Sequence, residues 1–139
     1  MAIQVGPLLQ AFFSEPNPAI IGTTRADGSV HMNPVWYEFH DGLIWLNGGP
    51  TRDWVRHVRR DPRITILVVD PKNMFRWAQI HGRLLDTTAE GADEHIDRLA
   101  QRYFGGPYPN PKIDRLIVRI QPERIRGGDT RQPWDVSET

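Results

Sequence analysis

Arginines and glycines gather in one short stretch of the chain, where they could bind an anionic ligand. Gly48 and Gly49 would let the backbone approach a ligand closely, and Thr51 is placed to cap the helix that follows. The first N–H groups of a helix attract anions, and Arg52 and Arg56 are four residues apart, which brings two side chains together on a helix. The pattern predicts a phosphate or carboxylate site, with an ordinary turn and a solvated arginine-rich helix as an equally favoured alternative.

Composition excludes or disfavours several other kinds of site. The chain has no cysteine, which excludes disulfides, thiolate metal ligands and a cysteine nucleophile. Its five histidines show neither His-x-His nor His-Glu-x-x-His spacing, so we expect no metal site. Arginines between positions 52 and 63 could suggest a nucleic-acid partner, but 17 basic residues balance 17 acidic ones and no stacking motif lies among them. We therefore expect no nucleic-acid partner, and the sequence alone assigns no catalytic side chain.

Length and hydrophobic content indicate one domain. The chain has 139 residues, 39% of them hydrophobic, which suffices for a single modest core. We expect the domain to cover residues 1–127 and a polar tail, whose Trp134 could fold over a cleft, to cover residues 128–139. No segment approaches the roughly 18 apolar residues of a membrane span, and the N-terminus lacks the pattern of a secretion signal. We therefore expect a soluble, cytoplasmic protein with no membrane partner.

The elements that position the anion motif are predicted to be mainly antiparallel strands. Apolar, β-prone segments between turn residues predict six strands, at 19–24, 30–40, 43–46, 63–70, 76–86 and 114–121. Turn residues at 26–28, 41–42 and 71–73 join them into three hairpins. Pro34 predicts an edge or a bulge in the second strand. Hairpin connections favour a closed antiparallel barrel over a parallel sheet.

Three helices are predicted to pack on these strands. The first covers residues 7–15, with proline at its first position, and the second follows Thr51 as its N-cap. Thr87 and Glu90 have capping-box spacing ahead of the third helix, whose apolar residues recur at the helical period until Gly105 ends it. This third helix should cover the barrel as an amphipathic lid.

The order of these elements resembles a known family. A strand, a glycine loop, an arginine-containing turn, a helix that ends in Arg-Arg-Asp-Pro at 59–62 and an apolar strand resemble the split β-barrels related to pyridoxamine phosphate oxidase, especially their deazaflavin-using branch. Further segments with this resemblance lie at 24–31, 34–36, 80–84, 99–103 and 118–125. The resemblance therefore extends over most of the chain, from residue 12 to residue 127.

The resemblance implies a fold, an assembly and a cofactor site. The fold would be mainly β, a Greek-key split β-barrel of about six antiparallel strands with a few short helices. The protein would be a homodimer with two equivalent cofactor clefts along the subunit interface. Residues matched by position would face the cofactor's tricyclic ring (Asn33, Pro34, Val35), its linker and phosphate (Asn47, Gly48, Gly49, Thr51, Arg52) and its ring edge (Trp77, Gln79), with Arg56 as a further anion contact.

Trp54 departs from the family pattern. Family members usually carry a lysine at this position that binds the cofactor's anionic tail, and this chain has tryptophan there. Arg52 and Arg56 could replace the lysine. The indole of Trp54 could stack on the cofactor ring, although packing in the core is the favoured interpretation.

The implied function is that of an oxidoreductase. It would bind reduced F420, a deazaflavin, and transfer hydride to a small organic acceptor. Five arginines between positions 52 and 63 favour the long anionic tail of F420 over FMN, and an FMN-dependent oxidase or reductase of the same fold is the nearest alternative. A non-catalytic protein that binds a flavin, haem or tetrapyrrole is the alternative from another class, supported by the missing lysine. One fold serves many reactions, so the sequence does not indicate the acceptor.

Overall fold

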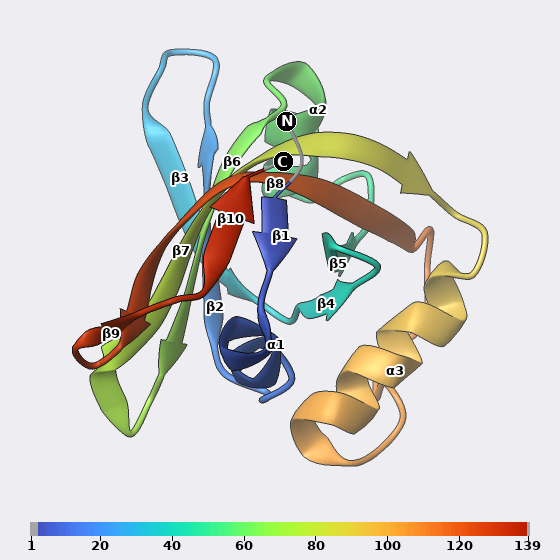
Figure 1. Ribbon diagram of the computed structural model, residues 1–139. Helices are drawn as coiled ribbons and strands as arrows, with labels where there is room; N and C mark the ends of the chain where they lie inside the picture. Colours follow the sequence, from blue (N-terminus) through green and yellow to red (C-terminus); the bar gives the residue numbers. More distant parts are fainter. Residues whose placement is uncertain (1–2, 139) are drawn as a thin grey trace.

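The computed structural model describes residues 3–138, and within them it contains ten strands and three helices (Figure 1). The strands are β1 (Ile3–Val5), β2 (Ala19–Thr24), β3 (Val30–Val35), β4 (Glu38–His40), β5 (Leu43–Gly48), β6 (Arg63–Asp70), β7 (Asn73–Thr88), β8 (Leu116–Asp129), β9 (Gln132–Pro133) and β10 (Val136–Glu138). The helices are α1 (Pro7–Phe13), α2 (Asp53–Arg60) and α3 (Ala92–Phe104). The fold is mainly β, as the sequence predicts.

All six expected strands are present, and local turn residues explain their hairpins. Asp41 and Gly42 adopt φ angles of 53° and 75° between β4 and β5, the conformation that a two-residue hairpin turn needs. Gly28, with φ of 87°, makes the turn between β2 and β3. The structure adds the short strands β1, β9 and β10 near the two ends of the chain.

The strand expected at 30–40 is divided into β3 and β4. Trp36 and Tyr37 lie between the two strands and leave the sheet. The ring of Trp36 stacks on Tyr103 of α3, whereas Tyr37 is fully buried in the core. The two aromatic side chains therefore pack in different places, and the strand is interrupted at these two residues.

The main sheet is antiparallel but not closed. Its order is β3-β2-β6-β7-β8-β5-β4, with β9 paired to β8. The expectation of a closed barrel is wrong, because the chain leaves the sheet at residues 36–37 and β3 and β4 remain as its two edges. Pro34 accordingly lies on an edge strand. The result is a split barrel that opens beside Trp36.

Alternate residues of the strands point into one hydrophobic core. Every second residue is buried in β2, in β5 and through most of β6, as the two-residue period of a strand requires. Helix α1 buries Leu9, Phe12 and Phe13 in the same core. Helix α2 adds Trp54 and Val58, which fixes the position of its N-terminus against the sheet.

The helices begin differently from the sequence prediction. Arg52, not Thr51, is the N-cap residue of α2, and its side chain makes no capping hydrogen bond. Strand β7 continues to Thr88, so Thr87 is still in the strand and forms no capping box with Glu90. Gly91, with φ of 76°, precedes α3, and Gly105 ends it as predicted.

Within residues 3–138, none of the helices is long and apolar enough to cross a membrane.

Residues 128–138 pack against the rest of the chain. Strand β9 pairs with β8, and β10 pairs with β1, which brings the two ends of the chain side by side (Figure 1). Trp134 is 7% exposed, stacks on Phe12 with ring centroids 4.8 Å apart, and donates its indole N–H to the carbonyl of Trp77 at 2.8 Å. The carboxylate of Asp135 accepts hydrogen bonds from two backbone N–H groups at the start of α1. Trp134 is thus part of the core and covers no cleft.

Candidate functional site

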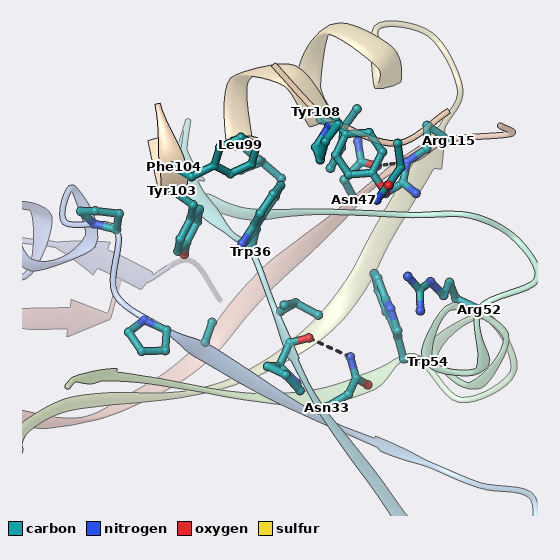
Figure 2. Close-up of a pocket in the computed structure, with 18 residues that line it drawn as sticks. Asn33, Trp36, Asn47, Arg52, Trp54, Leu99, Tyr103, Phe104, Tyr108 and Arg115 are labelled. Carbon is teal, nitrogen blue, oxygen red and sulfur yellow. Dashed lines mark hydrogen bonds between the residues drawn. The ribbon is translucent and has the colours of Figure 1, made fainter. Parts of the chain in front are cut away.

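A pocket of about 730 Å³ lies where the split sheet opens (Figure 2). Its size falls within the usual range for sites that bind small molecules and cofactors. Strands β3 and β5, the start of α2, helix α3 and the loop after α3 all contribute to it. The lining residues are Pro16, Pro18, Ala19, Asn33, Pro34, Val35, Trp36, Asn47, Arg52, Trp54, Ile96, Leu99, Tyr103, Phe104, Tyr108, Pro109, Asn110 and Arg115.

One end of the pocket is an aromatic wall. Trp36 stacks on Tyr103 with ring centroids 5.6 Å apart and an interplanar angle of 9°. Phe104 and Tyr108 pack against the same indole, with centroids 5.6 and 6.4 Å from it. The hydroxyl of Tyr103 donates a hydrogen bond to the carbonyl of Asn17 at 2.9 Å, which fixes the ring. The wall offers flat apolar surface to a conjugated ligand.

The positively charged end of the pocket adjoins this wall at Tyr108, whose ring centroid lies 5.3 Å from Cζ of Arg115. Figure 2 shows Arg52, just before α2, and Arg115, just before β8, at this end. The lining residues include no Asp or Glu, and neither arginine forms an ion pair with a carboxylate of residues 3–138. Burial lowers the pKa of Arg115, and the charge of Arg52 lowers it further, while Tyr108 opposes both. Two cations without an ion-pair partner among residues 3–138 therefore face one pocket.

Asn47 holds Arg115 in place at this end. Its side-chain oxygen accepts a hydrogen bond from Arg115 Nε at 2.8 Å. Its amide nitrogen lies 3.0 Å from the carbonyl of Ala92 and 3.0 Å from Nδ1 of His95. A primary amide has two N–H donors, and both are used by protein acceptors here. Asn47 therefore has no free donor for a ligand, although it lines the pocket.

The side chain of Asn47 is bound by a buried histidine, which in turn contacts a carboxylate. His95 is 1% exposed, and because its Nδ1 accepts from Asn47, the proton is placed on Nε2, which lies 3.2 Å from Oε1 of Glu38. Arg98 also binds the Glu38 carboxylate. Burial would raise the pKa of Glu38, but the close approach of His95 and the hydrogen bonds of Arg98 outweigh it and lower the pKa to about 2. Glu38 is therefore an anion at neutral pH.

Asn33 contributes a free acceptor to the pocket. Its amide nitrogen lies 3.2 Å from the carbonyl of Pro34, but its side-chain oxygen is buried and has no hydrogen-bond partner within the described residues. A buried acceptor without a partner costs free energy, of the order of 1–3 kcal/mol. A ligand with an N–H group at this position would remove that cost.

Trp54 belongs both to the core and to the pocket. The residue is 5% exposed and packs with the buried residues of the sheet, as the favoured interpretation of the sequence holds. Its indole nevertheless forms part of the pocket wall between the two arginines and Asn33 (Figure 2). The residue therefore shapes the pocket through its packing.

The structure brings together half of the residues that the sequence resemblance assigns to the cofactor. The pocket is lined by Asn33, Pro34, Val35, Asn47, Arg52 and Trp54. The other six, Gly48, Gly49, Thr51, Arg56, Trp77 and Gln79, do not line it.

Four of these six residues have another environment in the structure. Gly48 lies behind Trp54, and Arg56 forms an ion pair with Asp53, three residues before it on α2. Gln79 lies in a second groove, on the outer face of β2, β3, β6 and β7. The two-residue period of β7 places Trp77 on the same face as Gln79.

Among the twelve lining residues that sequence reasoning missed, five carry the aromatic and charged character of the pocket. They are Trp36, Tyr103, Phe104, Tyr108 and Arg115. The sequence predicts the third helix from the period of its apolar residues, which assigns none of them to a pocket. No local sequence signal indicates them, because their places in the pocket depend on contacts between residues distant in sequence.

Comparisons with known proteins relate this fold to a family. The family model described as pyridoxamine 5'-phosphate oxidase matches residues 6–128, which include every residue that lines the pocket. An F420H(2)-dependent biliverdin reductase of Mycobacterium tuberculosis (strain CDC 1551 / Oshkosh) is 31% identical over 122 residues, covering 84% of this chain and 83% of that protein.

Solved structures also have this fold. The structure of an F420 reductase superposes with a TM-score of 0.76 at 23% identity, covering 84% of this chain and 94% of that one. A conserved hypothetical protein of Mycobacterium tuberculosis superposes with a TM-score of 0.75 at 25% identity, covering 93% of this chain and 88% of the other.

Proposed function

Because the chain belongs to the pyridoxamine 5'-phosphate oxidase family, we propose that it is an oxidoreductase that binds a reduced deazaflavin of the F420 type in this pocket and reduces a small organic acceptor. The observation that carries this proposal is the chemistry of the lining. Among the lining residues there is no Ser, Thr, Cys, His, Lys, Asp or Glu. A pocket without a nucleophile or a carboxylate, in this family, suits a reaction whose chemistry comes from a bound cofactor.

The residues present also suit such a cofactor. The unpartnered oxygen of Asn33 could accept a hydrogen bond from a ring N–H group. The side chains of Val35 and Trp54 add apolar surface to the same pocket. Arg52 and Arg115 offer positive charge for the anionic tail of the deazaflavin. The F420 relative supports this cofactor over FMN, whose binding is the alternative outcome of the test below.

The side chains would act by binding and orientation. A bound reduced deazaflavin would supply a hydride to the acceptor and become oxidised, and solvent would supply the proton that completes the reduction. Asn33 would orient the ring of the cofactor, and the aromatic wall of Trp36, Tyr103, Phe104 and Tyr108 would hold a flat acceptor and exclude water. Because the F420H(2)-dependent relative is a biliverdin reductase, a linear tetrapyrrole is the first acceptor to test.

We also propose that two subunits associate through the outer face of β2, β3, β6 and β7. The second groove crosses this face and includes the apolar side chains of Ile20, Met32 and Leu67. Met32 is 63% exposed in the single chain, so a partner subunit that covered this groove would bury its apolar side chain. Trp77 and Gln79 share this face, so they would reach a cofactor only in the pocket of a partner subunit.

A fluorescence titration tests the cofactor assignment. The purified protein is titrated with oxidised F420 and, in parallel, with FMN. We expect saturable binding of F420 and much weaker binding of FMN. Preference for FMN would transfer the protein to flavin-dependent chemistry, and binding of neither would contradict the proposal.

A turnover assay then tests the activity. Reduced F420 is mixed with the protein and biliverdin, and oxidation of F420 is followed by its absorbance. Oxidation that requires both protein and acceptor is the expected result. Binding of F420 without oxidation by any acceptor tested would favour a non-catalytic carrier.

A further inference from the structure

Arg115 lines the pocket, although neither its spacing to other charged residues nor its neighbours in sequence indicate this position. It follows a proline-rich loop, and its guanidinium packs on the ring of Tyr108 with 5.3 Å between Cζ and the ring centroid. Its Nε is bound to Asn47, but no hydrogen bond occupies its two terminal nitrogens within residues 3–138. The terminal N–H groups are therefore free to bind a ligand, and the side chain is already held.

The charges around Arg115 leave an anion as the matching ligand. Arg52 lies at the same end of the pocket, and its charge is close enough to act on Arg115 (Figure 2). Asp93 also acts on Arg115, but its effect is smaller than that of Arg52. Asp53, in the first turn of α2, would repel an anion, but Arg56 neutralises it. The net charge of the pocket lining is positive.

We propose that Arg115, together with Arg52, binds a phosphate or carboxylate group of the ligand in this pocket, and that Asn47 acts as the positioning residue for Arg115. The identity of the ligand rests on the proposed function, whereas the anion site itself does not. Two guanidinium groups on either side of an anion can each donate charge-assisted hydrogen bonds. Orientation by Asn47 reduces the side-chain entropy that Arg115 loses on binding.

Two probes separate the anion site from the cofactor. Inorganic pyrophosphate, titrated by calorimetry at millimolar concentration, reports the anion site alone. F420, titrated by fluorescence, reports the site as part of cofactor binding. The variants are Arg115→Gln, which keeps a donor for Asn47 but removes the charge, and Arg115→Lys, which keeps the charge.

Arg124→Gln is the matched control. Arg124 is exposed on β8, lies opposite His81 in the ladder with β7, and is absent from the pocket lining. Its replacement removes the same charge from the protein. Melting temperatures of all variants are measured first, so that any loss of binding by a folded variant can be assigned to the site.

We expect Arg115→Gln to weaken binding of both probes by about 10- to 100-fold, the range for one or two hydrogen bonds to a charged group. Arg115→Lys should recover part of this loss, and Arg124→Gln should stay within about twofold of the wild type. Equal affinities of Arg115→Gln and the wild type for pyrophosphate, or no binding of pyrophosphate by the wild type, would overturn the proposal.

The remaining outcomes assign the source of the anion. Loss of pyrophosphate binding by Arg115→Gln while F420 affinity stays unchanged would support the anion site and assign it to a carboxylate of the acceptor, with a raised KM for that acceptor. If the wild type binds pyrophosphate through Arg115 but binds neither F420 nor FMN, the anion site stands and the proposed function fails.

A double-mutant cycle tests the role of Asn47. If Asn47 acts through Arg115, Asn47→Ala weakens pyrophosphate binding in the wild type but has no further effect in the Arg115→Gln background. A purely structural role for Asn47 would lower the melting temperature equally in both backgrounds and leave the anion affinity of the wild type unchanged. Additive effects of the two substitutions on affinity would contradict the positioning role.

Discussion

Asn33 and Asn47, two asparagines of the pocket, differ in how far their hydrogen-bonding capacity is used. Both donors of the Asn47 amide are bound by protein acceptors, and its oxygen is bound by Arg115. Asn33 instead keeps a buried oxygen without a partner. A residue that is satisfied in the free protein serves to position its neighbours, whereas an unsatisfied one is prepared for a ligand.

Replacing Asn33 by leucine should therefore separate stability from binding. Removing a buried acceptor without a partner relieves a cost of about 1–3 kcal/mol, so the free energy of unfolding of Asn33→Leu should equal or exceed that of the wild type. Affinity for F420 should fall by about 3- to 10-fold, the effect of one neutral hydrogen bond. Urea unfolding and fluorescence titration measure the two quantities. A variant that is less stable but binds F420 normally would show that the Asn33 oxygen serves the fold.

Glu38 gives the fold a dependence on acid pH. Its pKa is about 2 in the folded protein against an ordinary value of 4.5, and its side chain is 14% exposed. A carboxyl with a lowered pKa stabilises the fold above its unfolded pKa, and this contribution is lost as the pH falls from about 4.5 towards about 2.

The substitution Glu38→Gln should remove most of this contribution. At about 1.4 kcal/mol for each pKa unit, the loss at pH 7 is up to about 3 kcal/mol. The difference between wild type and variant should shrink as the pH falls below about 4.5, as measured by urea unfolding at several pH values. Glu90→Gln is the control, because Glu90 is exposed and lies outside both the pocket and the second groove. A constant difference at all pH values would contradict the assignment to the Glu38 charge.

At the scale of elements, the connection between β5 and α2 shapes the pocket through packing. A Cβ atom on Gly48 would lie 2.6 Å from the indole of Trp54 and 3.1 Å from Val55. Gly49 has room, since its nearest neighbours would be at 3.7 Å or more. The absence of a side chain at Gly48 therefore makes space for Trp54 and not for a ligand.

Gly48→Ala should destabilise the protein by about 1–3 kcal/mol, the usual cost of overpacking, and should move Trp54 in the pocket wall. Gly49→Ala should have a much smaller effect on both stability and F420 affinity. In the double variant Gly48→Ala/Trp54→Phe, the smaller ring should restore part of the stability. Thermal unfolding measures the stability of all three variants. Equal destabilisation by the two single alanine substitutions would show that the loss of backbone freedom, and not the contact with Trp54, causes the destabilisation.

The sequence predicts those elements whose signals are local. Asp41-Gly42 and Gly105 lie at the ends of elements, and their backbone conformations follow from residue type. The order of strands and helices also sufficed to indicate the family. Arg56 was predicted as an anion contact from its spacing to Arg52, and in the structure it forms an ion pair with Asp53, three residues before it.

The rest of the fold and of the pocket depends on contacts between residues distant in sequence. The break between β3 and β4 depends on the stacking of Trp36 on Tyr103 of α3. Arg115 enters the pocket because Asn47, 68 residues before it, binds its guanidinium. No local pattern carries such pairings, so a single sequence cannot assign these residues to the pocket.

At the scale of the whole molecule, the two grooves share the edge strand β3. Asn33 and Pro34 belong to the pocket, whereas Val30 and Met32 belong to the groove on the outer face. A second subunit on the outer face would therefore lie next to the pocket. Gln79, which lies in this outer groove, would then be supplied to the site by the partner subunit.

Met32→Glu tests this assembly. In a two-fold symmetric interface the substitution occurs twice, and burying unpaired charges costs several kcal/mol for each interface. Met32 is 63% exposed in the single chain, so the same substitution should change the stability of an isolated subunit by no more than about 0.5 kcal/mol. Met74→Glu is the matched control, because Met74 is 77% exposed at the turn between β6 and β7 and lies outside the groove.

Sedimentation equilibrium and F420 titration on the same samples give the result. We expect the wild type and Met74→Glu to be dimers that bind F420, and Met32→Glu to be a folded monomer with weakened binding. A monomeric wild type would contradict the assembly. A monomeric Met32→Glu variant with full affinity for F420 would show that one subunit contains the whole cofactor site, and Trp77 and Gln79 would then have no part in binding.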